Sequence, residues 1–260
     1  MKETSTPDSG STWNSIYKVG AAAALVCALM YLIALGIYVP ANRAGPPPAT
    51  VLEWFTLFQD SPLTGLFFLG MADIAIMILW APMSLALYVA LKPSNKTWSL
   101  IAAAFVFVGI AVYLATNTAF SMLSLSQRFA VATTQTEQTI LLAAGQALLA
   151  LSEGTGGQYA GMPLAWFGGL LLSAVMLRSK FFSRANAWVG MLGFALLLLS
   201  MLFAGYTTAG PTTPVESVMI AVTYIGGGLL SLVWYVQVSL SLFKLGRFEE
   251  KKFPAVSRLE

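Results

Sequence analysis

Asp73 is the one ionisable side chain in the long apolar stretch 62–91. That stretch is longer than the roughly 20 apolar residues that a helix needs to cross a bilayer. A carboxylate inside a span is costly to insert, so we expect it to face protein or trapped water rather than lipid. Such a group can anchor a ligand, a proton or an ion, or it can hydrogen-bond a neighbouring helix and fix its register. The sequence leaves both interpretations of Asp73 open.

Other polar side chains are expected at the same depth as Asp73. Measured from the basic turn at Lys92 and Lys96, Asp73 and Asn117 lie about 28 Å and about 32 Å away at 1.5 Å per residue. Glu216 enters its helix from the same side. Helical spacing also places Tyr113, Asn117, Ser121, Ser124 and Arg128 on one stripe. We therefore hypothesise a cavity that opens outward, with a predicted lining of Asp73, Trp80, Tyr113, Asn117, Glu216 and Tyr224.

Each of these residues also has a purely structural interpretation. Asn117 is typical of the amide side chains that join helices inside a membrane. Glu216 suits a helix N-terminus, where the helix dipole favours negative charge. Tyr and Trp side chains near the ends of spans commonly belong to the aromatic belts of the two interfaces.

The composition places the chain in the membrane class. Hydrophobic residues make up 57% and charged residues 10% of the 260 positions, whereas soluble domains carry about 25% charged residues. Histidine is absent and Cys27 is the only cysteine, which excludes the usual zinc sites and Ser–His–Asp or Cys–His catalysis. We predict no cofactor, metal or catalytic residue, and we favour an enzymatic role least. Nucleic acid is not an expected partner, because the basic residues border apolar spans.

Six segments are predicted to span the membrane, which makes the chain an all-α, polytopic bundle over 18–245. Residues 1–17 are predicted to be a disordered cytoplasmic tail, and 246–260 a basic cytoplasmic tail ending in what looks like a cloning scar. With both termini cytoplasmic, Arg43 and Arg128 are the only ones of the 14 basic residues on the outside, as the positive-inside rule favours. The predicted spans are 18–39, 62–91, 97–120, 158–177, 185–204 and 215–245.

Two amphipathic segments are predicted on the outer side. Residues 50–61 mix Trp54 with Glu53, and the segment is too short to span, so a helix at the interface fits it. Residues 131–154 alternate apolar and polar groups. An interfacial helix is the favoured interpretation there, and a re-entrant segment is the alternative.

Three clusters of small residues indicate where helices approach each other closely. They comprise 20–24, 168–169 and 226–228. Such faces pack against other helices of the same chain or, in a homo-oligomer, against a second copy.

Two segments resemble one bacterial family. Residues 73–117 read DIAIMILWAPMSLALYVALKPSNKTWSLIAAAFVFVGIAVYLATN, and 181–194 read FFSRANAWVGMLGF. Both are similar to the integral membrane family called domain of unknown function 4386. The resemblance implies a six-helix protein of the bacterial cytoplasmic membrane and implies no reaction. The resemblance also implies a polar, sometimes histidine-containing, segment entering the fourth span. This chain reads SEGTGGQYAG there, so a histidine-dependent role is not expected.

Two functions from different classes follow from these patterns. The first is a protein that binds or transports a small amphiphile or lipid in an outer-facing polar cavity near Asp73. The second is a structural or accessory membrane subunit without a ligand, whose polar residues only hold helices together. The first predicts space beside Asp73. The second predicts that Asp73 bonds directly to Asn117 or to a serine, with no void.

Overall fold

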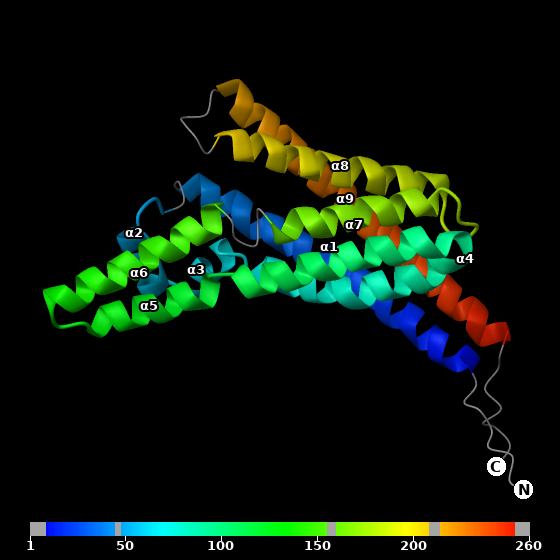
Figure 1. Ribbon diagram of the computed structural model, residues 1–260, viewed down its shortest axis with the longest axis horizontal. Helices are drawn as coiled ribbons and strands as arrows, with labels where there is room; N and C mark the ends of the chain where they lie inside the picture. Colours follow the sequence, from blue (N-terminus) through cyan, green and yellow to red (C-terminus); the bar gives the residue numbers. More distant parts are fainter. Residues whose placement is uncertain (1–8, 45–47, 155–159, 208–213, 253–260) are drawn as a thin grey trace, which may run out of the picture. The chain divides into compact units, whose positions relative to one another are not determined.

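The computed structural model describes residues 9–44, 48–154, 160–207 and 214–252 (Figure 1). These residues are helical or lie in short connections, and none of them is in a strand. The all-helical class predicted from the sequence is therefore confirmed. The helices are α1 (Ser9–Ala44), α2 (Val51–Asp60), α3 (Pro62–Phe68), α4 (Met71–Thr116), α5 (Ala119–Val131), α6 (Gln135–Gly154), α7 (Gly161–Met176), α8 (Arg184–Thr207) and α9 (Pro214–Lys252).

Long apolar helices make this a membrane protein. Within the described residues, 4 helical stretches are long and apolar enough to cross a membrane, and Gly161–Met176 is a shorter apolar helix. The four stretches are Asn14–Ala34, Met71–Val131, Arg184–Phe203 and Val218–Phe248.

Both terminal helices extend beyond their predicted spans. α1 begins at Ser9 rather than at Lys18, and α9 continues to Lys252. The two extensions pack on each other, because a Cβ added at Gly246 would lie 3.3 Å from the side-chain oxygen of Asn14. The outermost residues of both predicted tails, including the supposed cloning scar, lie outside the described part of the chain.

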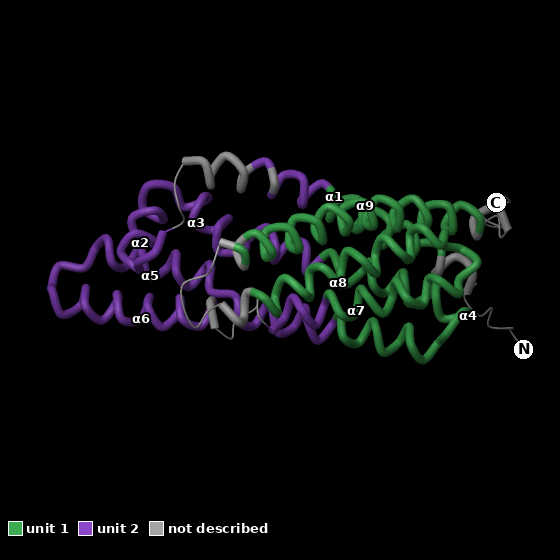
Figure 2. The backbone as a smooth tube through the Cα atoms, turned by 90° about the horizontal axis from the view of Figure 1, so that it is seen from above, with its two compact units in different colours: residues 1–28, 79–106, 166–260 green, residues 29–78, 107–165 purple. Residues whose placement is uncertain are grey.

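The chain divides into two compact units (Figure 2). Unit 1 comprises 1–28, 79–106 and 166–260, and unit 2 comprises 29–78 and 107–165.

Unit 1 is built by close approach of long helices through small residues. A Cβ at Gly20 of α1 would overlap Ala86 of α4, and one at Gly227 of α9 would lie 2.9 Å from the Gly193 carbonyl oxygen of α8. The Ser239 hydroxyl donates to the Ala21 carbonyl at 2.8 Å, which joins α9 to α1. A Cβ at Gly168 of α7 would likewise lie 2.7 Å from the Ala102 carbonyl oxygen of α4. Residues of all three small clusters therefore pack inside the chain, which is one of the two alternatives that the sequence left open.

α4 contains a sharp break at Asn95, which has φ −162° and ψ 97°. The Asn95 side-chain oxygen accepts the Trp98 N–H at 3.1 Å and caps the helix that follows. The two ends of α4 meet again in unit 2, where the Tyr113 hydroxyl donates to the Gly70 carbonyl at 3.4 Å. α4 is therefore a hairpin of two helical arms, and its turn lies in the polar segment that follows Leu91.

Unit 2 adds four shorter helices with a hydrophobic core of their own. α2, α3, α5 and α6 enclose Phe55 and Phe58, which are 0% and 1% exposed. The Ser126 hydroxyl of α5 donates to the Phe55 carbonyl at 2.8 Å and ties α5 to α2. α6 contributes Leu141 and Leu149 to this core. The segment 131–154 thus contains one continuous helix packed onto α5 and α2.

α2 coincides with the predicted amphipathic segment and begins with a capping box. The Thr50 hydroxyl accepts the Glu53 N–H at 3.2 Å. In return the Glu53 carboxylate accepts the backbone N–H groups of Ala49 at 2.7 Å and Thr50 at 3.2 Å. These backbone hydrogen bonds, that from Ala49 foremost, hold the pKa of Glu53 below its usual range.

Candidate functional site

The predicted third span ends earlier than expected, and the break positions the candidate site. α4 ends at Thr116, and α5 begins at Ala119 after a change of backbone direction at Asn117, whose ψ is 130°. A helix was predicted to run on to 120, which is not what the structure has. Apolar periodicity does not report this break, which is accompanied by polar contacts of the Asn117 side chain, one of them to Leu69, far away in the sequence.

Asn117 ties two helix junctions of unit 2 together. Its amide nitrogen donates to the Leu69 carbonyl at 3.2 Å and to the Tyr113 hydroxyl at 3.4 Å. Its side-chain oxygen accepts the Ala119 N–H at 3.0 Å, at the start of α5. The end of α3 is thereby fastened to the joint between α4 and α5. Among the described residues, the side-chain amide of Asn117 is hydrogen-bonded to these partners and not to Asp73.

Gly70 is the point on which the predicted side chains of unit 2 converge. It has φ +91°, the left-handed conformation that residues with a Cβ avoid. A Cβ there would lie 2.5 Å from the Tyr113 hydroxyl, 3.4 Å from the Asn117 amide and 3.5 Å from a carboxylate oxygen of Asp73. The structure therefore brings three of the six predicted site residues together, around a glycine that the sequence did not single out.

Asp73 lies in the first turn of α4, where the helix dipole favours its negative charge. The side chain is half-buried. Tyr113 beside it is 1% exposed. It lies between Gly70 and Gly161 of α7, since a Cβ added at Gly161 would be 2.6 Å from the Tyr113 backbone nitrogen. Asp73 is thus a carboxylate at the edge of a rigid junction.

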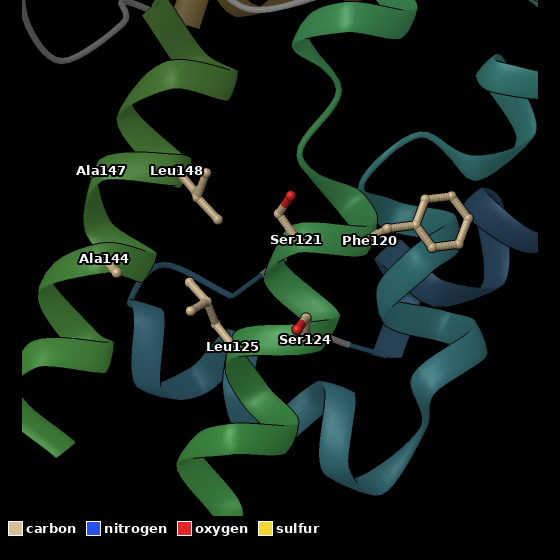
Figure 3. Close-up of a pocket in the computed structure, with 7 residues that line it drawn as sticks. All are labelled: Phe120, Ser121, Ser124, Leu125, Ala144, Ala147 and Leu148. Atoms are coloured by element: carbon tan, nitrogen blue, oxygen red, sulfur yellow. The ribbon is translucent and has the colours of Figure 1, made fainter. Parts of the chain in front are cut away.

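An open groove lies between α5 and α6 in the same unit (Figure 3). Its volume is about 640 Å³, within the range of roughly 300–1,000 Å³ that is usual for small-molecule sites. Leu148 points from α6 towards α5, and the hydroxyls of Ser121 and Ser124 are on the α5 side. The residues that line it are Phe120, Ser121, Ser124, Leu125, Ala144, Ala147 and Leu148.

Two of the residues that line this groove could have been predicted from the sequence. Ser121 and Ser124 lie on the polar stripe that continues from Asn117, yet they were not included in the predicted lining. The α6 wall could not be predicted from the sequence, because periodicity does not tell which surface helix faces which. The groove begins in the first turn of α5 and therefore close to the Asn117 joint.

The remaining predicted residues belong to unit 1. Trp80 is 2% exposed and its indole N–H donates to the Tyr235 hydroxyl at 2.9 Å. Its ring centroid lies 5.6 Å from that of Phe194, so Trp80 belongs to a packed aromatic cluster. Tyr224 is 45% exposed on α9. Glu216 falls in the first turn of α9, and its side chain lies outside the described part of the structure.

Unit 1 also holds buried polar groups outside the predicted lining. Asn186 is 1% exposed, and neither atom of its amide has a hydrogen-bond partner among the described residues. The same holds for the Ser231 hydroxyl and the Trp234 indole N–H of α9. Buried polar groups of this kind are commonly hydrogen-bonded by internal water.

Comparison with known proteins identifies a family. The model of the family described as a domain of unknown function (DUF4386) matches residues 19–237. No curated protein and no solved structure matches the chain. The matched range contains the Gly70 junction and the α5–α6 groove.

Proposed function

The chain belongs to the DUF4386 family, and from this premise we propose that it is a multi-pass protein of the bacterial cytoplasmic membrane that binds a lipid or small amphiphile. The observation that carries the proposal is the groove between α5 and α6. It offers about 640 Å³ bounded by apolar side chains and two hydroxyls. A mainly apolar cleft with few polar groups is the usual chemistry of a small-molecule site.

An amphiphile fits the distribution of polarity in unit 2. The groove starts beside the Asn117 joint, around which Asp73 and Tyr113 also lie. A polar headgroup would be held at that end, with Asp73 as its anchor and Ser121 within the first turn of α5. The apolar tail would follow the groove past Leu125 and Leu148.

The proposed topology has six spans with both termini in the cytoplasm. α1, the two arms of α4, α7, α8 and α9 would cross the membrane, and the break at Asn95 supports counting α4 twice. The distribution of basic residues supports the orientation. α2, α3, α5 and α6 would then lie on the outer side, where the groove can receive a ligand from the outer leaflet.

Native mass spectrometry of the gently solubilised protein tests the binding function. The probes are oleate and lysophosphatidylethanolamine, each added to wild type, to Ala147→Phe, which fills the groove, and to Asp73→Asn. Ala143→Phe is the matched control, because Ala143 is exposed on the same helix and does not line the groove. We expect wild type and the control to retain a probe, Ala147→Phe to lose it and Asp73→Asn to hold it more weakly. Equal retention by all four proteins, or by none, would refute the proposal.

A structural or accessory role is the second candidate, and the bonding of Asn117 favours it. The hydrogen bonds of that side chain to Leu69, Tyr113 and Ala119 all serve helix junctions. In this case wild type carries neither probe and instead copurifies with a second protein or as a homo-oligomer. Chemical crosslinking in intact membranes distinguishes these two assemblies.

A further inference from the structure

A second depression lies in unit 1, where the break of α4 meets the end of α7. Its volume is about 330 Å³. One side is aliphatic and consists of Leu171, Ala174, Val175 and Leu177, the last part of α7 and the residue after it. The remaining lining residues are polar or aromatic: Asn95 and Trp98 of α4, and Arg178, which follows Leu177. None of these residues belongs to the predicted cavity or to the α5–α6 groove.

The polar side of this depression suits an anion. Arg178 is exposed immediately after α7, in a tight turn where its N–H donates to the Val175 carbonyl at 3.0 Å. A guanidinium offers a planar pair of donors that matches phosphate oxygens. The second arm of α4 begins at Asn95, which lines the depression and caps the Trp98 N–H, and the dipole of this arm attracts negative charge to that end.

The two connections that contribute Asn95 and Arg178 to the depression carry further positive charge. The connection after α7 also carries Lys180 and Arg184, and the α4 turn carries Lys92 and Lys96. Basic pockets between membrane helices are typical sites for the headgroups of anionic lipids. The Trp98 side chain is 51% exposed at the rim, as expected for an aromatic residue at headgroup level.

We propose that this depression binds one anionic phospholipid of the phosphatidylglycerol type. Its phosphodiester contacts Arg178 and the first turn of the second α4 arm, and one acyl chain runs along the aliphatic side of α7. A free phosphate ion would leave the aliphatic side unused, and a zwitterionic lipid would gain less from the surrounding lysines and arginines. The site is independent of the proposed function, because it shares no residue with the groove of unit 2.

The test is native mass spectrometry of the full chain with phosphatidylglycerol and, separately, phosphatidylcholine of the same acyl chains. We expect wild type to retain one phosphatidylglycerol in preference to phosphatidylcholine by about tenfold, the change expected when a charge-assisted hydrogen bond is made or lost. Arg178→Gln should abolish that preference. Lys180→Gln is the matched control, because it removes the same charge two residues away and does not line the depression. It should keep most of the preference.

A second variant separates the lipid from a free anion. Ala174→Phe fills the aliphatic side without a change of charge, so it should lower the retention of phosphatidylglycerol while leaving the helical content measured by circular dichroism unchanged. The proposal is wrong if both charge variants weaken retention equally, since that would indicate general surface charge. It is also wrong if Ala174→Phe has no effect while inorganic phosphate displaces the lipid completely, since the site would then bind a free anion.

Discussion

Unit 1 and unit 2 are stabilised by different means. In unit 1, long helices approach until a glycine on one meets side chains or carbonyls on the next, as Gly20 meets Ala86 and Gly227 meets Gly193. In unit 2, short helices are joined by polar side chains at their ends, as Asn117 joins the end of α3 to the start of α5. The packing of unit 1 therefore requires residues without a side chain at the helix contacts, and unit 2 requires hydrogen bonds that fix the direction of the chain.

This difference also separates the two candidate binding regions. The groove of unit 2 lies between two short helices joined by a turn, where packing leaves room. The interior of unit 1 contains the packed rings of Trp80, Phe194 and Trp234, and its depression lies where the break of α4 meets the end of α7. Substitutions that add volume should therefore damage the core of unit 1 and be tolerated in the groove of unit 2.

The largest effect is expected from Gly190→Leu in unit 1. A Cβ at this position already overlaps the Ser173 hydroxyl and the Trp234 ring, so the three helices that meet there must separate. Overpacking of this kind costs about 3 kcal/mol of unfolding free energy. Gly226→Leu is the control, since the nearest atom to its Cβ is Leu196 at 3.7 Å. Thermal unfolding in detergent should show a large loss for the first variant and almost none for the second, and equal losses would contradict the steric account of unit 1.

A smaller effect is expected from Gly70→Ala in unit 2. The left-handed backbone and the contact with the Tyr113 hydroxyl both oppose a Cβ, and together they should cost about 1–2 kcal/mol. Tyr113→Phe removes the oxygen that the Cβ meets, so in that background the cost of Gly70→Ala should fall. Thermal unfolding of the two single variants and the double variant gives this coupling. A cost that is identical in both backgrounds would assign the whole effect to the backbone.

The features predicted well from the sequence belong to single helices. The segment 50–61 was predicted as a short amphipathic helix, and α2 occupies Val51–Asp60. The mixture of apolar and charged residues, such as Trp54 beside Glu53, can be recognised without knowing what the helix packs against. The small residues at 20–24 likewise indicate close packing but do not identify the neighbouring helix. The rise of a helix predicted a common height for Asp73 and Asn117, and both side chains lie around the Gly70 junction. Their depth in a membrane stays a prediction.

The features that were missed depend on contacts between distant segments. At the break, Asn117 donates to the Leu69 carbonyl, 48 residues away in the sequence, and nothing in the spacing of apolar residues reports this contact. Gly70 is needed for its positive φ, which is a property of the folded backbone. The prediction that Trp80, Tyr224 and Glu216 share the cavity of Asp73 stays a prediction, because helix periodicity gives faces and depths but not neighbours.

The smallest effect is expected at the start of α2, from the pH dependence of Glu53. Its pKa is lowered from the usual value of 4.5 by backbone hydrogen bonds, that from Ala49 foremost. A carboxylate whose folded pKa is depressed stabilises the fold above its unfolded pKa, and this stabilisation is lost as the pH falls through the folded pKa. In wild type the capping box should therefore weaken below about pH 4.5. In Glu53→Gln the capping box should already be weaker at pH 7, and its strength should not change as the pH falls below about 4.5. Carbon-13 NMR titration of the Glu53 carboxylate measures the shift. A titration at or above the value of a free glutamate would mean that polar capping does not hold this end of unit 2, and that its hydrophobic core alone orders α2.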